Sequence, residues 1–221
     1  MVYEAPGWDA LLARISAYDR RLRQLTPAAV QLAARSHAML AEAVRVLEDG
    51  SGAGEAEIRA ADRRVDADAA AITDSVLELM SLQQPDPDDL RTMAAVLRIV
   101  RELERIADYA GHVAAYARRP LPGQPWRAQL AALGRSTLDL VDRMVTSLSG
   151  GEAGAARALA AADDEVDRRY HALEEAWNRA SADGSPGPWV NLALIARELE
   201  RIGDHAVNVG RMLTFAAGGR S

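Results

Sequence analysis

One ten-residue phrase occurs twice in this chain of 221 residues. Residues 101–110 read R-E-L-E-R-I-A-D-Y-A and residues 197–206 read R-E-L-E-R-I-G-D-H-A, so eight of the ten positions are identical. The second copy begins 197 − 101 = 96 residues after the first. That separation is too long for one unit of a solenoid, so the repeat indicates a duplicated domain.

The spacing of apolar residues predicts an all-α protein. They recur every three or four positions along nearly the whole chain, and no alternating strand pattern appears. Between breaks at stretches rich in Gly and Pro, the expected helices cover residues 8–48, 55–82, 88–117, 126–148, 152–182 and 189–217. Pro27 should interrupt or kink the first helix, because proline removes a backbone donor and crowds the preceding turn.

The stretch from Arg118 to Gly123 is the expected boundary between two halves, because Pro and Gly are concentrated there. We therefore predict two tandem three-helix bundles related by internal duplication. The first, with an N-terminal extension at residues 1–17, covers residues 1–119, and the second covers residues 124–221.

Composition argues against several classes of function. The formal net charge is −6, which argues against a nucleic-acid-binding protein. The absence of cysteine excludes thiolate zinc sites and iron–sulfur clusters. No apolar stretch reaches the roughly 18 residues of a membrane span and no signal peptide is visible, so we expect a cytoplasmic protein.

Each copy of the phrase places two acids on adjacent turns of one helix. Glu104 and Asp108, like Glu200 and Asp204, are four residues apart, where like charges repel each other. Both glutamates also fall on the apolar arc of their helices, where a carboxylate loses hydration unless it is paired, protonated or metal-bound. The helix before each phrase adds two acids at the same spacing, namely Asp62 with Asp66 and Asp163 with Asp167.

Carboxylates grouped in this way are typical of cation sites. Without cysteine, they suit Mg²⁺, Mn²⁺, Ca²⁺ or iron. The alternative is an ion-pair network without metal. Arg105 and Arg201 follow the two glutamates directly, and Arg101 and Arg197 lie three residues before them. His112 and Asn208 occupy matching positions one turn after the aspartates. Together with Arg105 and Arg201, they are further candidates for ligands or supporting residues.

The two phrases resemble the signature of the PhoU family of phosphate-uptake regulators. The likeness rests on residues 104–108 and 200–209, on the P-D-P-D-D-L-R run at residues 85–91 and on D-D-E-V-D at residues 163–167. It implies two tandem three-helix bundles, each with a carboxylate-rich metal cluster of iron, manganese, zinc or magnesium. The implied ligands are Asp62, Asp66, Glu104 and Asp108 in one half, and Asp163, Asp167, Glu200 and Asp204 in the other.

Two positions of the first phrase depart from the family pattern. Ala107 stands where the family usually has Gly, and His112 stands where it usually has Asn. We therefore expect the first metal site to differ from the second in its metal or its occupancy.

The resemblance also implies a regulatory adaptor that is not an enzyme and has no catalytic residues. Its expected partners are the ATPase of a phosphate ABC transporter and a membrane sensor histidine kinase, through which it restrains the phosphate-starvation response. Membrane association would be peripheral and through these partners. Whether the chain forms a homodimer stays open.

Two alternatives stand beside this prediction. One is a carboxylate-bridged metalloenzyme or metal-storage bundle of the ferritin-like type. Such sites use a Glu-x-x-His pair, and none of the four histidines follows a Glu by three residues. The other is a plain helical scaffold whose acids are only paired with arginine.

Overall fold

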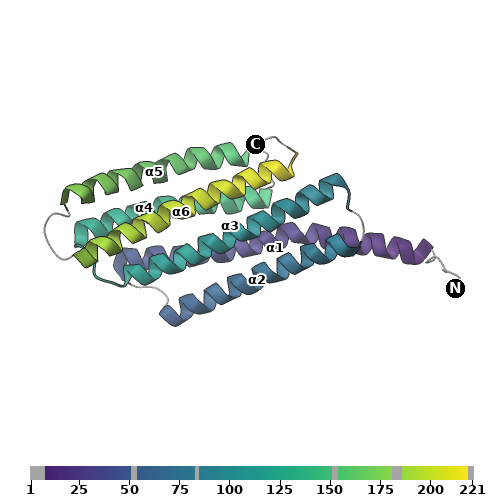
Figure 1. Ribbon diagram of the computed structural model, residues 1–221, viewed down its shortest axis with the longest axis horizontal. Coiled ribbons are helices and arrows are strands. Elements are labelled where there is room, and N and C mark those ends of the chain that lie inside the picture. The colour runs from purple at the N-terminus through teal and green to yellow at the C-terminus, as the bar shows by residue number, and fades with distance from the viewer. Residues whose placement is uncertain (1–7, 51–53, 83–84, 151–153, 181–185, 219–221) are drawn as a thin grey trace.

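The computed structural model describes residues 8–50, 54–82, 85–150, 154–180 and 186–218, and these residues form helices without any strand (Figure 1). The six helices are α1 (Trp8–Asp49), α2 (Glu55–Leu82), α3 (Pro87–Ala117), α4 (Gln124–Gly150), α5 (Ala155–Ala180) and α6 (Pro186–Ala216). The three helices of each half pack on one another. The predicted all-α class and the tandem three-helix bundles are therefore confirmed.

Helix α1 continues through Pro27, so the interruption predicted there is wrong. Proline forfeits one backbone hydrogen bond inside a helix. Leu25 and Ala29, on either side of it, are buried in the core, and this packing holds the helix together across the missing bond. The predicted N-terminal extension lies in part outside the described residues, as do the predicted breaks at residues 150–151 and 183–188. In their described parts, Gly150 ends α4 and residues 186–188 already belong to α6, which begins three residues earlier than predicted.

The start of α3 shows how local sequence sets a helix boundary. Asp86 precedes the helix, and its carboxylate accepts hydrogen bonds from the backbone N–H groups of Asp88 and Asp89 at 2.9 and 2.8 Å. Pro87 occupies the first turn, where its missing donor costs nothing. This cap fixes where the helix that carries the first phrase begins.

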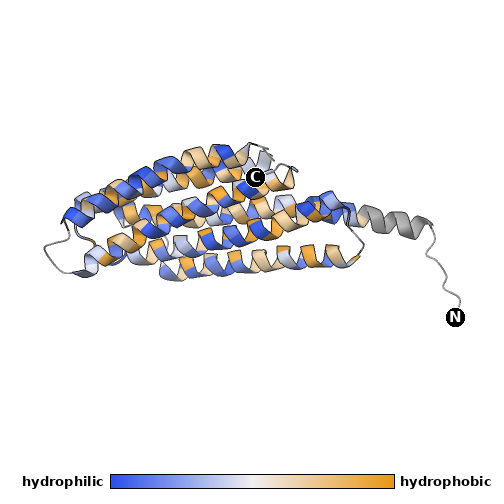
Figure 2. Ribbon diagram, turned by 45° about the horizontal axis from the view of Figure 1, so that its top comes forward, coloured by the Kyte–Doolittle hydropathy of each residue, from blue (hydrophilic) through white to orange (hydrophobic). Residues whose placement is uncertain are grey.

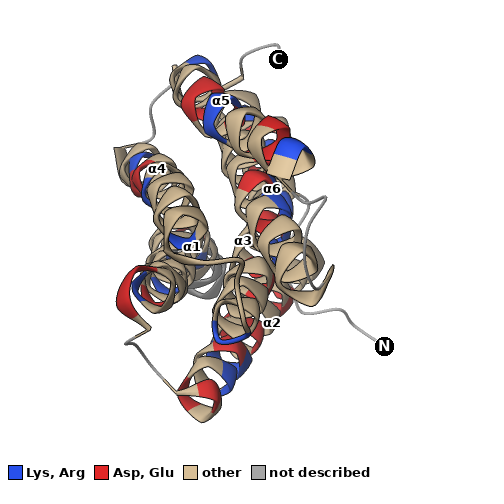
Figure 3. Cartoon of the chain, turned by 90° about the vertical axis from the view of Figure 1, so that its left-hand side faces the viewer, with Lys and Arg blue, Asp and Glu red and all other residues tan. Residues whose placement is uncertain are grey.

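The two bundles lie side by side. α3 packs along α6 and α1 packs along α4, while α2 and α5 lie on opposite flanks (Figures 1 and 3). Among the described residues, α2 contacts only α1 and α3, and α5 contacts only α4 and α6. Each helix carries both apolar and polar residues along its length (Figure 2), so apolar stripes face inward between the helices. No described helix has the length and apolar character of a membrane span.

Equivalent buried hydrogen bonds reflect the duplication. The hydroxyl of Ser36 in α1 donates to the carbonyl of Leu103 at 3.0 Å, and that of Thr137 in α4 donates to the carbonyl of Leu199 at 3.5 Å. Leu103 and Leu199 are the same position of the repeated phrase. The first helix of each bundle therefore contacts the phrase at the same point.

Candidate metal centres

In the second bundle, the carboxylate of Asp163 on α5 lies against α6 at Gly203. A Cβ added at Gly203 would lie 2.4 Å from Asp163 Oδ1, so only glycine leaves room for the carboxylate in this place. Asp163 Oδ1 and Glu200 Oε2 are both buried and accept no hydrogen bond. Orphaned acceptors of this kind cost free energy unless a proton, a ligand or a metal satisfies them.

The electrostatics of this place also favour a cation. Burial raises the pKa of Asp163 to about 7, and Asp167, Asp204 and Glu200 add to the rise. Burial also raises the pKa of Glu200, against the opposing effect of Arg197 at 2.7 Å. Asp167 and Asp204 thus act on the pKa of both Asp163 and Glu200. A cation among them would relieve both the burial and the mutual repulsion.

In the first bundle, the structure brings three of the four predicted carboxylates together. Burial raises the pKa of Asp62, and the charges of Asp66 and Asp108 add to the rise. Glu104 and Asp108 each form an ion pair with the arginine three residues before them, at 3.7 and 3.6 Å. For these two acids, the predicted alternative of pairing with arginine is therefore what the structure contains.

The first bundle lacks the close approach seen at Gly203. The equivalent residue, 203 − 96 = 107, is Ala107, which is fully buried. A methyl group at the matching position of the second bundle would lie 2.4 Å from Asp163 Oδ1. Among the described residues, no carboxylate of the first bundle has a buried oxygen without a hydrogen bond.

As the side chains are placed, no three His, Asp or Glu residues within the described ranges stand close enough to hold a metal ion. Binding therefore requires rotation of side chains toward one another. The second bundle fits a cation well, because it offers orphaned oxygens and an all-carboxylate donor set. The eight predicted ligands and the predicted metals stay predictions.

The four predicted supporting residues lie in different surroundings. Arg105 pairs with Asp108. Arg201 lies 3.6 Å from Glu198 Oε2, with its guanidinium 5.5 Å from the centre of the Tyr109 ring. His112 and Asn208, the remaining two, meet residues of the opposite bundle.

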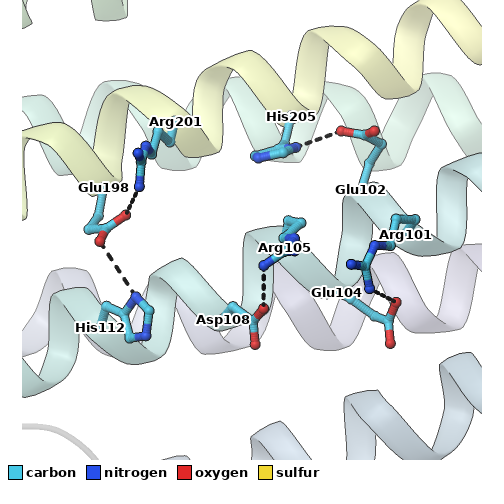
Figure 4. Close-up of polar contacts among 9 residues, drawn as sticks. All are labelled: Arg101, Glu102, Glu104, Arg105, Asp108, His112, Glu198, Arg201 and His205. Atoms are coloured by element: carbon cyan, nitrogen blue, oxygen red, sulfur yellow. Dashed lines mark hydrogen bonds and ion pairs between the residues drawn. The ribbon is translucent and has the colours of Figure 1, made fainter.

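A cluster of polar contacts between α3 and α6 went unpredicted. Glu102 accepts hydrogen bonds from His205 Nδ1 and from Asn208 Nδ2, the second at 3.2 Å. Glu198 Oε1 lies 3.5 Å from His112 Nδ1 (Figure 4). We call these five residues the inter-bundle cluster. The bonds from His205 and Asn208 outweigh the effect of burial on Glu102 and lower its pKa.

The inter-bundle cluster has a pseudo-two-fold character. Glu102 and Glu198 are the same position of the phrase, and His112 and Asn208 are also equivalent because 112 + 96 = 208. Each glutamate meets the residue at that position in the other bundle. The sequence contained a signal for these contacts. Glu102 lies two residues before Glu104, hence roughly 200° around the helix, so the two glutamates point to nearly opposite sides of α3.

Comparisons with known proteins agree with the duplicated fold. The PhoU domain matches the chain twice, over residues 29–117 and 130–213. A phosphate-specific transport system accessory protein PhoU homolog of Xylella fastidiosa is 31% identical over 93% of this chain and 88% of its own length. A protein of the same description from Deinococcus radiodurans is 28% identical over 90% of this chain and 95% of its own length.

Among solved structures, the phosphate transport system regulatory protein PhoU from Streptococcus pneumoniae has a TM-score of 0.80 and 21% identity, covering 92% of this chain and 98% of its own. PhoU from Pseudomonas aeruginosa has a TM-score of 0.72, also at 21% identity, covering 94% of this chain and 99% of its own. At this identity the likeness shows the fold alone.

Proposed function

Because the chain belongs to the PhoU family, we propose that it is a regulatory adaptor of phosphate uptake and does not turn over a substrate. The observation that carries this proposal is the match of the PhoU domain to both halves of the chain. The relatives that match over most of its length are described as accessory proteins of phosphate-specific transport systems. The proposed role is to restrain transport and the starvation response when phosphate is plentiful.

The proposed partners are the ATPase of a phosphate ABC transporter and a membrane sensor histidine kinase. The proposed location is the cytoplasm, and any contact with the membrane is made through these partners. Deletion of the gene, followed by measurement of phosphate-starvation transcripts in high phosphate, tests the role. We expect the transcripts to rise and to fall again when the chain is restored, whereas unchanged transcripts would contradict it. A pull-down against the transporter ATPase tests the partner.

We also propose that both bundles bind metal through their carboxylates. Two features of the second bundle support this: the contact of Asp163 with Gly203 and the orphaned oxygens of Asp163 and Glu200. The metal supplies positive charge that neutralises the acids, and it thereby stabilises the packing of α5 on α6. Elemental analysis after purification without chelators, and after incubation with iron, manganese, zinc or magnesium, tests this. Absence of stoichiometric metal in every case would overturn it.

A further inference from the structure

One face of the α3–α6 pair is left open, namely the face that points away from α1 and α4. In the end-on view none of the described helices lies over it (Figure 3). Two rows of residues meet along this face, one in α3 from Arg98 to Arg119 and one in α6 from Leu194 to Phe215. Each row advances in alternating steps of four and three residues, the spacing of a helix-pairing stripe. We call the two rows the outer seam.

The two rows of the outer seam run antiparallel. Toward one end, Arg98 donates to Met212 Sδ at 3.9 Å, and just beyond the other end Asn191 Nδ2 donates to Pro120 O at 3.1 Å. The inter-bundle cluster occupies the middle (Figure 4). Because every position of the α6 row lies 96 residues after one of the α3 row, the seam has a pseudo-two-fold axis at its centre.

Each end of the outer seam carries an exposed arginine held against an aromatic ring. The guanidinium of Arg98 lies 5.8 Å from the centre of the Phe215 ring at one end, and that of Arg119 lies 4.9 Å from the centre of the Tyr116 ring at the other. Stacking on a ring restricts an arginine side chain while its N–H donors stay accessible. Among the described residues, neither guanidinium forms an ion pair with a carboxylate.

Aliphatic side chains complete both ends. Met212 is half-buried beside Arg98, while at the other end Leu194 is 36% exposed and Val190, one turn before it, is 54% exposed. Arginine, aromatic residues and methionine are enriched where proteins bind one another, and tyrosine and arginine often dominate the binding energy. The two ends therefore resemble two small interface hot spots of like composition, about 30 Å apart along the helices.

We propose that the outer seam is a docking surface for a homodimeric protein, and that each subunit of this partner brings the same segment, acidic with apolar neighbours, to one end of the seam. Carboxylates are the strongest partners of guanidinium groups, so an acidic segment complements Arg98 and Arg119. A homodimer presents one segment twice about a two-fold axis, which matches the pseudo-two-fold axis of the seam. This inference rests on the proposed function as an adaptor and specifies the surface that meets the partner.

A second copy of this chain fits the outer seam less well. Both ends of the seam carry an arginine, so two seams aligned end to end would place guanidinium groups opposite one another. Like charges facing each other across an interface cost free energy. The charge of the seam ends therefore favours a partner of opposite charge over self-association.

The test is a titration of the full-length chain with the purified transporter ATPase, whose dimeric state is first established by light scattering. The variants Arg98→Glu and Arg119→Glu each reverse the charge at one end, and a third variant combines the two. Arg23→Glu is the matched control, because Arg23 is an exposed arginine on α1, outside the seam. Circular dichroism and thermal unfolding establish that each variant is folded.

We expect one chain to bind per ATPase dimer. Arg98→Glu and Arg119→Glu should each weaken binding by roughly 10- to 100-fold, the usual effect of losing a hot spot, and by similar factors because the ends are equivalent. The double variant should bind more weakly than either, because neither end then holds a subunit. Arg23→Glu should bind like the unaltered chain.

The possible failures are distinguishable. If both charge reversals leave binding unchanged, the outer seam is not the docking surface, while the proposed adaptor function stands. If only one end matters, or each ATPase subunit takes its own chain, the two-fold pairing is wrong. If the unaltered chain self-associates and the double variant is monomeric, a second copy occupies the seam and the inference is overturned. If the unaltered chain binds no ATPase, the proposed partner fails and this inference fails with it.

Discussion

Two glycines of α6 should respond in opposite ways to the same substitution by alanine. In the interior of a helix, Gly→Ala stabilises by about 1 kcal/mol where a methyl group has room. At Gly203 the new Cβ would lie 2.4 Å from Asp163 Oδ1. That obstacle is the far end of a side chain, which can rotate toward solvent. At Gly210 the obstacles include backbone atoms of α5, namely Ala155 O and Ala156 Cα, both at 3.2 Å.

The magnitudes follow from these contacts. Moving the Asp163 carboxylate outward relieves the burial that raises its pKa from 3.8 to about 7. A shift of about 3 units corresponds to about 4 kcal/mol, or about 2 kcal/mol after discounting for partial exposure. Together with helix propensity, Gly203→Ala should raise the free energy of unfolding of metal-free protein by about 1–3 kcal/mol at neutral pH. Gly210→Ala should lower it by about 1–2 kcal/mol, because overpacking outweighs propensity.

The assay is urea unfolding of chelator-treated protein, followed by circular dichroism. Metal content is measured in parallel on protein that has not been treated with chelator. Gly203→Ala should gain stability while it loses metal from the second centre. A loss of stability at Gly203 as large as that at Gly210 would show that the contact with Asp163 serves packing. If Gly203→Ala kept all of its metal, the reasoning would also be refuted, because the second centre would then not need the space at Gly203.

Three further predictions concern the acids and a buried hydroxyl. The folded pKa of Asp163, about 7, lies above its ordinary 3.8, so the folded state binds the proton more tightly than the unfolded state. Metal-free protein should therefore lose stability as the pH rises from about 4 to 7. Thermal unfolding across this range should show a weaker loss of stability for Asp163→Asn. Glu102→Gln weakens the charge-assisted bonds to His205, which should lower the free energy of unfolding by about 1–3 kcal/mol in urea titrations. Ser36→Ala removes the buried bond to Leu103, and the same measurement should show a loss of about 1 kcal/mol.

The fold was predictable because its signals are local. The spacing of apolar residues and the breaks at Gly and Pro placed all six helices within a few residues of their observed ends. Pro27 is the exception, because its local effect is outweighed by packing of the residues on either side. Tertiary contacts of this kind have no signature in the neighbouring sequence.

The candidate site was predictable in part. The repeat and the resemblance to the PhoU family placed Asp163 and Glu200 in one group, and the effect of Glu200 on the pKa of Asp163 agrees with that. Comparison of the two phrases also distinguished Ala107 from Gly203. The structure gives the reason for the glycine, namely the approach of the Asp163 side chain from α5. The inter-bundle cluster was missed because it depends on the packing of α3 against α6, which no periodicity within either helix specifies.

The acids of the repeated phrase face two different neighbours of the helix that carries them. In α3, Glu102 contacts α6, while Asp108 lines the pocket shared with α2. A helix is stiff along its length, so a displacement of α3 at Asp108 is expected to reach the contact of Glu102 with α6 as well. Glu198 adds a second connection, because it belongs to α6 and contacts His112 of α3. The contacts of Glu102 and Glu198 therefore connect the acidic side of α3 physically to the other bundle.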